Sequence, residues 1–235
     1  MEALFLFLYL KVKPDEKINR SCFMVKIKSF VFNDFQENTI VLSDESNRCI
    51  FIDPGCFVEQ ERKELDNFLK DNNLTPEMIV NTHCHVDHIL GNNYLVDKYN
   101  LPVYAHVSDE KLIATAKEYA KLFGLNISSP PAVTSYLKDG DTLSFGNSSL
   151  SVIHVPGHSP GSIALYHPEQ KFIIAGDVLF YGSIGRTDLP GGNYDMLINS
   201  IRQKLLTLPG DVIVYPGHGP VTTIQQEHDT NPFLQ

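Results

Sequence analysis

The sequence is poor in cysteine. Its 235 residues contain only four, Cys22, Cys49, Cys56 and Cys84, and no two of them are spaced as Cys-x-x-Cys. A disulfide framework is therefore not expected in a chain of this length, and we predict a reducing, cytoplasmic setting.

Long hydrophobic runs are also missing. The apolar segment Leu4–Leu10 (LFLFLYL) is far shorter than the roughly 20 residues that a membrane-spanning helix needs. It matches a signal peptide poorly, because Glu2 precedes it and Lys11 follows it. We expect no membrane partner, and we interpret residues 1–23 as a peripheral N-terminal extension. The remaining residues, 24–235, are expected to form a single domain.

Positive charge is scarce. The chain has 19 lysines and arginines against 28 aspartates and glutamates, which gives a formal net charge of −9. This balance argues against a nucleic-acid partner, which favours a basic face, although charge can be local. Apolar residues make up 43% of the chain and charged residues 20%, so a buried core is expected and disorder is not.

Short runs of β-branched and aromatic residues alternate with turns and with helical patterns. The runs predict strands at Val25–Phe32, Thr39–Ser43, Cys49–Ile52, Met78–Asn81, Pro102–Ala105, Leu150–His154, Ile163–Tyr166, Phe172–Ala175 and Val212–Val214. Apolar residues at helical spacing predict helices at Val58–Asn72, Ile89–Tyr99, Ser108–Phe123 and Tyr194–Thr207, with a short one after Thr222. This mixture indicates a layered α/β domain.

The segment Thr82–His88 (THCHVDH) concentrates side chains that bind metals. Side chains two residues apart on extended backbone point to the same side, so His83 and His85 can face one ion. Asp87 and His88 stand where the chain turns toward the predicted helix, so they can point to a neighbouring spot. The alternative is a polar loop with incidental histidines, which the density of histidine and aspartate disfavours.

Three further residues follow the ends of predicted strands, where loops build functional sites: His158, Asp177 and His218. Taken alone, a turn histidine is usually a surface residue and a lone aspartate usually a cap. Together with THCHVDH, they complete a set of candidate metal ligands.

The order of these residues, His-x-His-x-Asp-His and then histidine, aspartate and histidine, resembles that of the metallo-β-lactamase superfamily. The resemblance covers nearly all of the chain from about Met24 onward. It implies an α/β fold of four layers, the αββα sandwich, in which two mixed sheets lie between helices. In such a fold the metals lie at one edge of the sandwich.

The resemblance also implies two divalent metal ions. The first would be held by His83, His85 and His158, and the second by Asp87, His88 and His218, with Asp177 bridging them. Asp53 resembles a structural aspartate of the family, and Cys84 is interpreted as a non-ligand. Imidazole and carboxylate ligands without thiolate suit zinc, the expected metal, with iron or manganese as alternatives.

Two segments resemble short bacterial proteins related to glyoxalase II, the hydroxyacylglutathione hydrolases. They are GDVLFYGSIGRTDLPGGN, from Gly176 to Asn193, and the ending YPGHGPVTTIQQEHDTNPFL. The resemblance implies hydrolysis of a small-molecule thioester or ester such as S-lactoylglutathione. Arg186 would contact the glutathione moiety, and Asp87 would orient the attacking water.

The chain departs from the longer glyoxalase II enzymes in two ways. Asp188 stands where they carry a tyrosine, and only 17 residues follow His218, so their C-terminal helical domain is not expected here. Because that domain supplies much of the glutathione site, the helix at 108–123 and the loop through Pro131 are candidates to cover the cleft instead. The alternative is a plain surface helix.

Other functions of the same fold stay open. The main alternative is a persulfide dioxygenase, which uses one iron held by two histidines and one aspartate. The presence of His88 and His218 favours a dinuclear hydrolase. A nuclease would need a large inserted domain, a lactamase is not indicated by the Gly-Arg-Thr-Asp loop, and a binding scaffold would have lost ligands.

Overall fold

A computed structural model describes residues 24–235 of the chain. The N-terminal extension predicted for residues 1–23 lies outside the described residues. No helix within the described range is both long enough and apolar enough to cross a membrane.

The first sheet has six strands in the order β1–β2–β3–β4–β5–β6. They are β1 (Lys26–Phe32), β2 (Glu37–Ser43), β3 (Arg48–Ile52), β4 (Thr75–Val80), β5 (Val103–Ala105) and β6 (Ser135–Tyr136). The pairs β1–β2 and β2–β3 are antiparallel, whereas β3 to β6 pair in parallel. The sheet is therefore mixed, and the C-terminal ends of β3 and β4 meet at one edge.

The second sheet also has six strands, in the order β14–β13–β10–β9–β8–β7. They are β7 (Thr142–Phe145), β8 (Ser148–His154), β9 (Ile163–His167), β10 (Phe172–Gly176), β13 (Ile213–Pro216) and β14 (Thr222–Thr223). Only β10 and β13 pair in parallel. A small hairpin, β11 (Leu179–Phe180) with β12 (Ser183–Ile184), follows β10.

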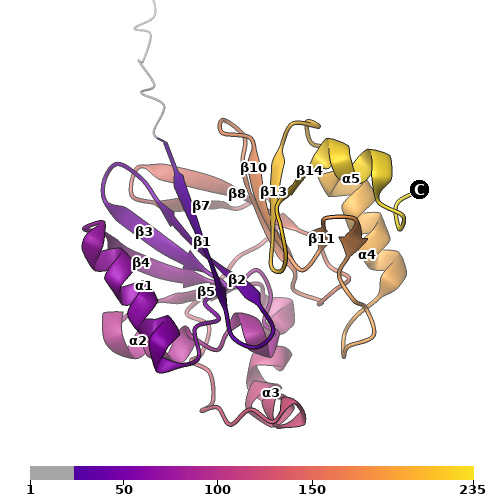
Figure 1. The fold of residues 1–235 in the computed structure, drawn as a ribbon. Helices are drawn as coiled ribbons and strands as arrows, with labels where there is room; N and C mark the ends of the chain where they lie inside the picture. The colour runs from indigo at the N-terminus through magenta and orange to yellow at the C-terminus, as the bar shows by residue number, and fades with distance from the viewer. Residues whose placement is uncertain (1–23) are drawn as a thin grey trace, which may run out of the picture.

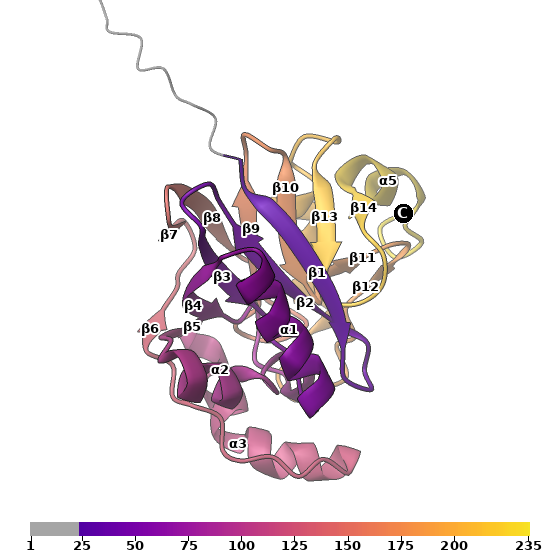
Figure 2. The same cartoon turned by 60° about the vertical axis from the view of Figure 1, so that its left-hand side comes forward.

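Helices cover the outer faces of both sheets. The helices are α1 (Glu59–Asp71), α2 (Asn92–Tyr99), α3 (Glu110–Ala120), α4 (Tyr194–Ser200) and α5 (Ile224–Thr230). In Figure 1, α1 and α2 lie beside the first sheet, and α4 and α5 lie on the opposite side beside the second. Figure 2 shows α3 at the far end, beyond α2. The four layers are those of the expected αββα sandwich.

Four buried clusters of side chains hold the described residues together. One joins the two sheets and includes Leu42, Ile50 and Leu165, each fully buried. Two others fill the spaces between each sheet and its helices, and the fourth packs α3 against the loop that carries THCHVDH. Every residue of β2 is buried, because this strand has neighbours in its own sheet and layers on both faces.

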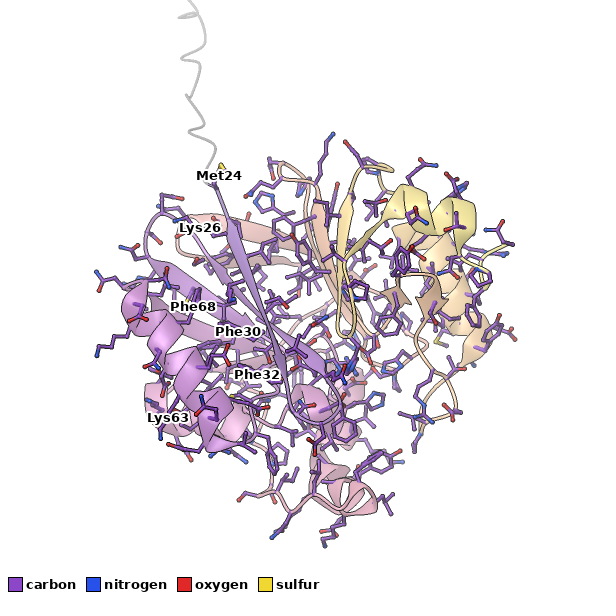
Figure 3. All side chains as sticks on the ribbon, in the orientation of Figure 1. Met24, Lys26, Phe30, Phe32, Lys63 and Phe68 are labelled. Atoms are coloured by element: carbon purple, nitrogen blue, oxygen red, sulfur yellow. The ribbon has the colours of Figure 1, made fainter. Side chains whose placement is uncertain are left out.

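The outer strand β1 shows how a helix is fixed to its sheet. Phe30 stacks on Phe32 with ring centroids 5.3 Å apart, and Phe68 of α1 meets Phe30 edge-on at the same distance. These rings are labelled in Figure 3, where they lie between the strand and the helix. Lys26 and Lys28 lie on the same face of β1 as these rings, because side chains two residues apart share a face, but they are not buried. This face is therefore covered by α1 only toward the C-terminal end of the strand, and Lys28 Nζ lies over the Phe30 ring, 4.8 Å from its centroid.

The predicted strands are confirmed to within a few residues, but the start of α2 was predicted wrongly. The sequence pattern placed it at Ile89, whereas α2 begins at Asn92 and a 3₁₀ turn occupies Val86–His88. The reason is a tertiary contact: the Gly91 amide donates to the Pro54 carbonyl at 2.7 Å, and this holds the backbone between the two helical segments. The short strands β6, β7, β11, β12 and β14 were not predicted.

Replacing Leu165 with alanine should lower the free energy of unfolding by about 2–5 kcal/mol, because it opens a cavity between the two sheets. Urea denaturation followed by circular dichroism measures this loss. The control is Leu122→Ala, since Leu122 is 76% exposed and its truncation should change stability by less than about 0.5 kcal/mol. Equal effects of the two substitutions would contradict the assignment of the core.

Candidate metal centre

Loops that follow the C-terminal ends of strands meet at one edge of the sandwich. The loop after β4 carries THCHVDH, and the loops after β8, β10 and β13 carry His158, Asp177 and His218. Hydrogen bonds between the sheets fix this edge: the Ile163 amide donates to the Thr82 carbonyl at 2.8 Å. The Asn38 amide donates to the Gly217 carbonyl at 2.7 Å. Residues far apart in the sequence are thus held within reach of one another.

The first group of candidate ligands consists of three buried histidines. His158 Nε2 lies 2.8 Å from His85 Nδ1 and 3.2 Å from His83 Nε2. The nitrogens of the three rings converge on one point, an arrangement that suits a cation shared by all three. His83 and His85 come from one loop, as their spacing on extended backbone predicted.

The second group consists of Asp87, His88 and His218. His218 Nε2 lies 3.2 Å from His88 Nε2 and 3.2 Å from Asp87 Oδ2. Asp87 and His88 belong to the 3₁₀ turn that precedes α2. That turn brings both side chains toward the loop after β13, which supplies His218, while the His88 ring stays 4.1 Å from the His83 ring between centroids.

Asp177 lies between the two groups. Its Oδ2 is 3.6 Å from His158 Nε2 on one side and 3.5 Å from His218 Nε2 on the other. Gly217 makes this approach possible, because a Cβ at that position would lie 2.2 Å from Asp177 Oδ1. A carboxylate in this place can contact ions in both groups, which is the bridging position expected from the resemblance.

The outer nitrogens of two histidines face backbone carbonyls. His158 Nδ1 lies 2.8 Å from the Arg186 carbonyl, and His218 Nδ1 lies 3.0 Å from the Phe35 carbonyl. A carbonyl only accepts, so each Nδ1 donates its proton and each Nε2 presents a lone pair to the centre. Partners of this kind fix the tautomer of a metal-binding histidine.

Burial and charge set the protonation states of His83, His85 and Asp177. Burial, followed by the neighbouring His158, lowers the pKa of His85 to about 3, and burial lowers the pKa of His83 well below its usual value. Both rings are therefore neutral near pH 7. Burial alone would raise the pKa of Asp177, but the adjacent His88 outweighs it and holds that pKa far below its usual range.

Several buried polar atoms at this edge have no hydrogen bond within the described part of the chain. They include His85 Nε2 and Asp177 Oδ1. Buried acceptors without partners are costly, and a bound cation removes that cost. The donor set of imidazole and carboxylate thus fits one or two divalent metals, with zinc, iron and manganese all compatible.

Asp53 contacts two residues of the THCHVDH segment, Thr82 and His88. Its carboxylate accepts hydrogen bonds from the backbone amide and the hydroxyl of Thr82, and its Oδ2 lies 3.2 Å from His88 Nδ1. Asp53 also lies close enough to His83 and His88 to form a third candidate group. Because both of its oxygens already accept from Thr82, we interpret Asp53 as an orienting residue, as the sequence indicated.

Two buried carboxylates of the centre were missed by the sequence analysis. Glu37 is fully buried with Oε1 4.0 Å from His88 Nδ1, and burial raises its pKa well above the usual value. Asp109 is also fully buried and accepts hydrogen bonds from the Cys84 amide at 3.0 Å and the Ser159 hydroxyl at 2.8 Å. It further accepts from the Gly161 amide at 2.6 Å.

Asp109 thereby fastens the two loops that supply the first group. Cys84 lies between His83 and His85, and Ser159 follows His158 directly. The carboxylate is thus one link between loops that approach from different sheets. No sequence motif distinguishes Asp109. An aspartate at the start of a predicted helix is ordinarily interpreted as a helix cap, so its role in joining two loops is not visible in the sequence.

The cleft above the metal centre has a volume of about 400 Å³. Tyr119 of α3 and the following Phe123 line it, so the segment expected to cover the cleft does contribute a wall. Arg186 also lines it and forms a two-pronged ion pair with Asp188, with both nitrogen–oxygen distances 2.7 Å. The predicted contact between Arg186 and glutathione stays a prediction.

Comparison with known proteins places this geometry in context. The family model described as the metallo-beta-lactamase superfamily matches residues 32–218. The chain is 41% identical over 197 residues to the probable metallo-hydrolase YqgX of Bacillus subtilis, covering 83% of this chain and 90% of that protein. It is 36% identical over 207 residues to the hydroxyacylglutathione hydrolase GloC of Haemophilus influenzae, covering 85% and 93%.

Two solved structures are similar over most of their length. BLEG-1, described as a B3 metallo-beta-lactamase, superposes with a TM-score of 0.82 at 38% identity and covers 89% of this chain and 100% of its own. TTHA1623, solved in a di-iron-bound form, has a TM-score of 0.80 at 40% identity and covers 88% and 100%. Similar folds thus occur in proteins with different descriptions.

Replacing Asp109 with asparagine should weaken metal binding by about 10–100-fold, because outer carboxylates orient the ligands around a metal. Titration with Zn²⁺ against a chromophoric chelator measures the affinity. Asp229→Asn, at an exposed residue of α5, is the matched control.

A second, milder variant keeps the prediction testable if the Asp109→Asn protein does not fold. Ser159→Ala removes one of the hydrogen bonds to Asp109 and should weaken binding by a smaller factor. If both variants fold as shown by circular dichroism and bind Zn²⁺ as tightly as the unaltered protein, Asp109 does not position the ligands.

Proposed function

Because the chain belongs to the metallo-beta-lactamase superfamily, we propose that it is a dinuclear metal-dependent hydrolase that cleaves thioesters. The observation that carries the proposal is the place of Asp177, whose Oδ2 lies within 3.6 Å of a histidine from each candidate group. A carboxylate shared between two groups is typical of a two-metal site.

The second group supports hydrolysis over the dioxygenase alternative. A mononuclear iron site needs two histidines and one carboxylate with open positions. Here His88 and His218 approach each other within 3.2 Å beside Asp87, which is a full set for a second ion. Zinc is the proposed metal, and the di-iron form of TTHA1623 keeps iron as the alternative.

Bound divalent cations supply Lewis acidity, which polarises a carbonyl and lowers the pKa of water toward neutrality. Asp87 would orient the attacking water, because its Oδ2 faces the centre, 3.2 Å from His218 Nε2 and 3.5 Å from His88 Nε2. Burial alone would raise the pKa of Asp87, but the nearby His88 and His218 outweigh burial and lower that pKa, so the carboxylate stays ionised.

A thioester suits this set of residues better than an amide does. A thiol has a pKa near ~8.5, so a thiolate leaves without a general acid, whereas an amine must first receive a proton. The side chains that converge at the centre are candidate metal ligands or orienting groups, so none of them is assigned as a general acid for an amine leaving group. The relative GloC, described as a hydroxyacylglutathione hydrolase, makes S-lactoylglutathione and related thioesters or esters the first substrates to examine.

Lactam hydrolysis is a second candidate function, because BLEG-1 carries that description at 38% identity. The chemistry differs in the leaving group, since opening a lactam releases an amine nitrogen rather than a thiolate. A panel that includes a chromogenic cephalosporin therefore separates the two.

The purified protein loaded with Zn²⁺ should bind two ions per chain and hydrolyse S-lactoylglutathione or a simple thioester such as S-acetyl-N-acetylcysteamine. Asp177→Asn should lower kcat/KM by at least about 100-fold, because the bridging carboxylate is lost. Asp211→Asn, at an exposed residue paired with Lys171, should leave the rate unchanged. Metal analysis by mass spectrometry and release of free thiol are the measurements.

Three outcomes would contradict the proposal. One is full activity of the Asp177→Asn protein. Another is a single iron with oxygen uptake on glutathione persulfide, which would establish the dioxygenase alternative. The third is a cephalosporin turned over faster than every thioester in the panel, which would favour a lactamase.

A further inference from the structure

The cleft above the metal centre offers little positive charge for a substrate with carboxylates. Among the described residues that line it, Arg186 is the sole lysine or arginine. Its guanidinium donates through Nε and one Nη to the two oxygens of Asp188, with both distances 2.7 Å. The Asp188 carboxylate therefore occupies the pair of guanidinium N–H donors with which Arg186 would bind a substrate carboxylate.

Glutathione carries two free carboxylates and one ammonium group. To bind as the thiol half of a thioester, it must place those carboxylates against donors outside the metal centre. The ion pair of Arg186 with Asp188 has no net charge, and both side chains are more than half exposed, at 58% and 68%. Competition with Asp188 therefore weakens any contact that Arg186 makes with a second carboxylate.

The same cleft is rich in aromatic surface. Four half-buried or partly exposed rings line it: Phe35, Tyr119, Phe123 and Phe180. Phe35 in the turn between β1 and β2 meets Phe123 edge-on at 5.5 Å, and Tyr119 meets Phe123 at 5.5 Å. The contact between Phe35 and Phe123 joins two segments that are distant in the sequence, on one side of the metal centre.

This aromatic wall, defined as the rings of Phe35, Tyr119, Phe123 and Phe180, borders the candidate ligand His218. Phe180 lies 6.4 Å from His218 between ring centroids, and the Phe35 carbonyl accepts from the same histidine. A substrate whose carbonyl lies at the metal centre therefore has apolar surface within reach of its substituents. Burial of an apolar group there is favourable, whereas burial of a charged group without a partner is costly.

We propose that the cleft selects thioesters whose substituents are apolar and uncharged, held against the aromatic wall, over thioesters of glutathione. This inference rests on the proposed function and narrows its substrate class. Phe123 and Phe35 are the specificity-determining residues of the wall. Asp188 discriminates against thiols with carboxylates by occupying Arg186.

The reaction itself is a simple hydrolysis. The oxygen of water bonds to the acyl carbon, and the carbon–sulfur bond breaks with its electron pair left on sulfur. The products are a carboxylic acid, released as its anion, and a thiol. No oxidant or reductant takes part.

The test uses a matrix of four thioesters on the zinc-loaded protein. Phenylacetyl and acetyl groups are each attached to N-acetylcysteamine, which is uncharged, and to glutathione. We expect kcat/KM to be at least about tenfold higher for N-acetylcysteamine than for glutathione with the same acyl group. We expect a similar advantage of phenylacetyl over acetyl.

Two variants assign these preferences to residues. Phe123→Ala should reduce the advantage of phenylacetyl over acetyl by at least about fivefold through a higher KM. Phe233→Ala is its matched control, because both phenylalanines are 44% exposed and Phe233 lies near the C-terminus outside the cleft. Asp188→Asn should raise kcat/KM for the glutathione thioesters relative to the N-acetylcysteamine thioesters with the same acyl group.

The outcomes separate this inference from the proposed function. If the protein binds two metals and hydrolyses none of the four thioesters, the proposed function is wrong and this inference with it. If thioesters are hydrolysed and those of glutathione are preferred, or if Asp188→Asn leaves their relative kcat/KM unchanged, only the substrate class inferred here is overturned.

Discussion

Imidazole and carboxylate groups that converge inside a protein suit a shared cation, and this convergence organises the edge of the sandwich. His158 Nε2 faces two other imidazoles within 3.2 Å, and Asp177 faces histidines from both groups. Some of their buried atoms, such as His85 Nε2 and Asp177 Oδ1, have no hydrogen bond within the described residues, and a cation would remove the cost of leaving them unpaired. The surrounding structure keeps them in place: Asp53 holds Thr82, and Asp109 joins the loops that carry the first group.

The sandwich supplies the rigidity that this arrangement requires. Strands buried on both faces, such as β2, end in loops whose bases cannot shift without disturbing the core. Because β3 and β4 run in parallel, as do β10 and β13, the loops that follow them emerge at one edge. The candidate ligands therefore come from four loops, those after β4, β8, β10 and β13, and the strands fix where each loop begins.

Much of this could be predicted from the sequence, because strands and motif carry local signals. Alternation and β-branched residues located the longer strands, and the spacing in THCHVDH placed His83 and His85 on one side. The start of α2 was predicted wrongly because the contact between Gly91 and Pro54 is tertiary. Asp109 was missed for the same reason, since its partner Ser159 is 50 positions away. The roles of these residues as metal ligands stay a prediction.

The substrate is decided by parts of the chain that the metal motif does not constrain. The same set of histidines and aspartates suits a hydrolase, a lactamase or, with fewer ligands in use, an oxygenase, so fold and ligands leave the chemistry open. What differs is the cleft, where α3 contributes Tyr119, the following turn contributes Phe123, and the loop after β12 places Asp188 against Arg186. A change in those side chains alters which molecule reaches the metals without touching a ligand. The proposed specificity therefore depends on the loops, and the proposed metal binding depends on the sheet edge beneath them.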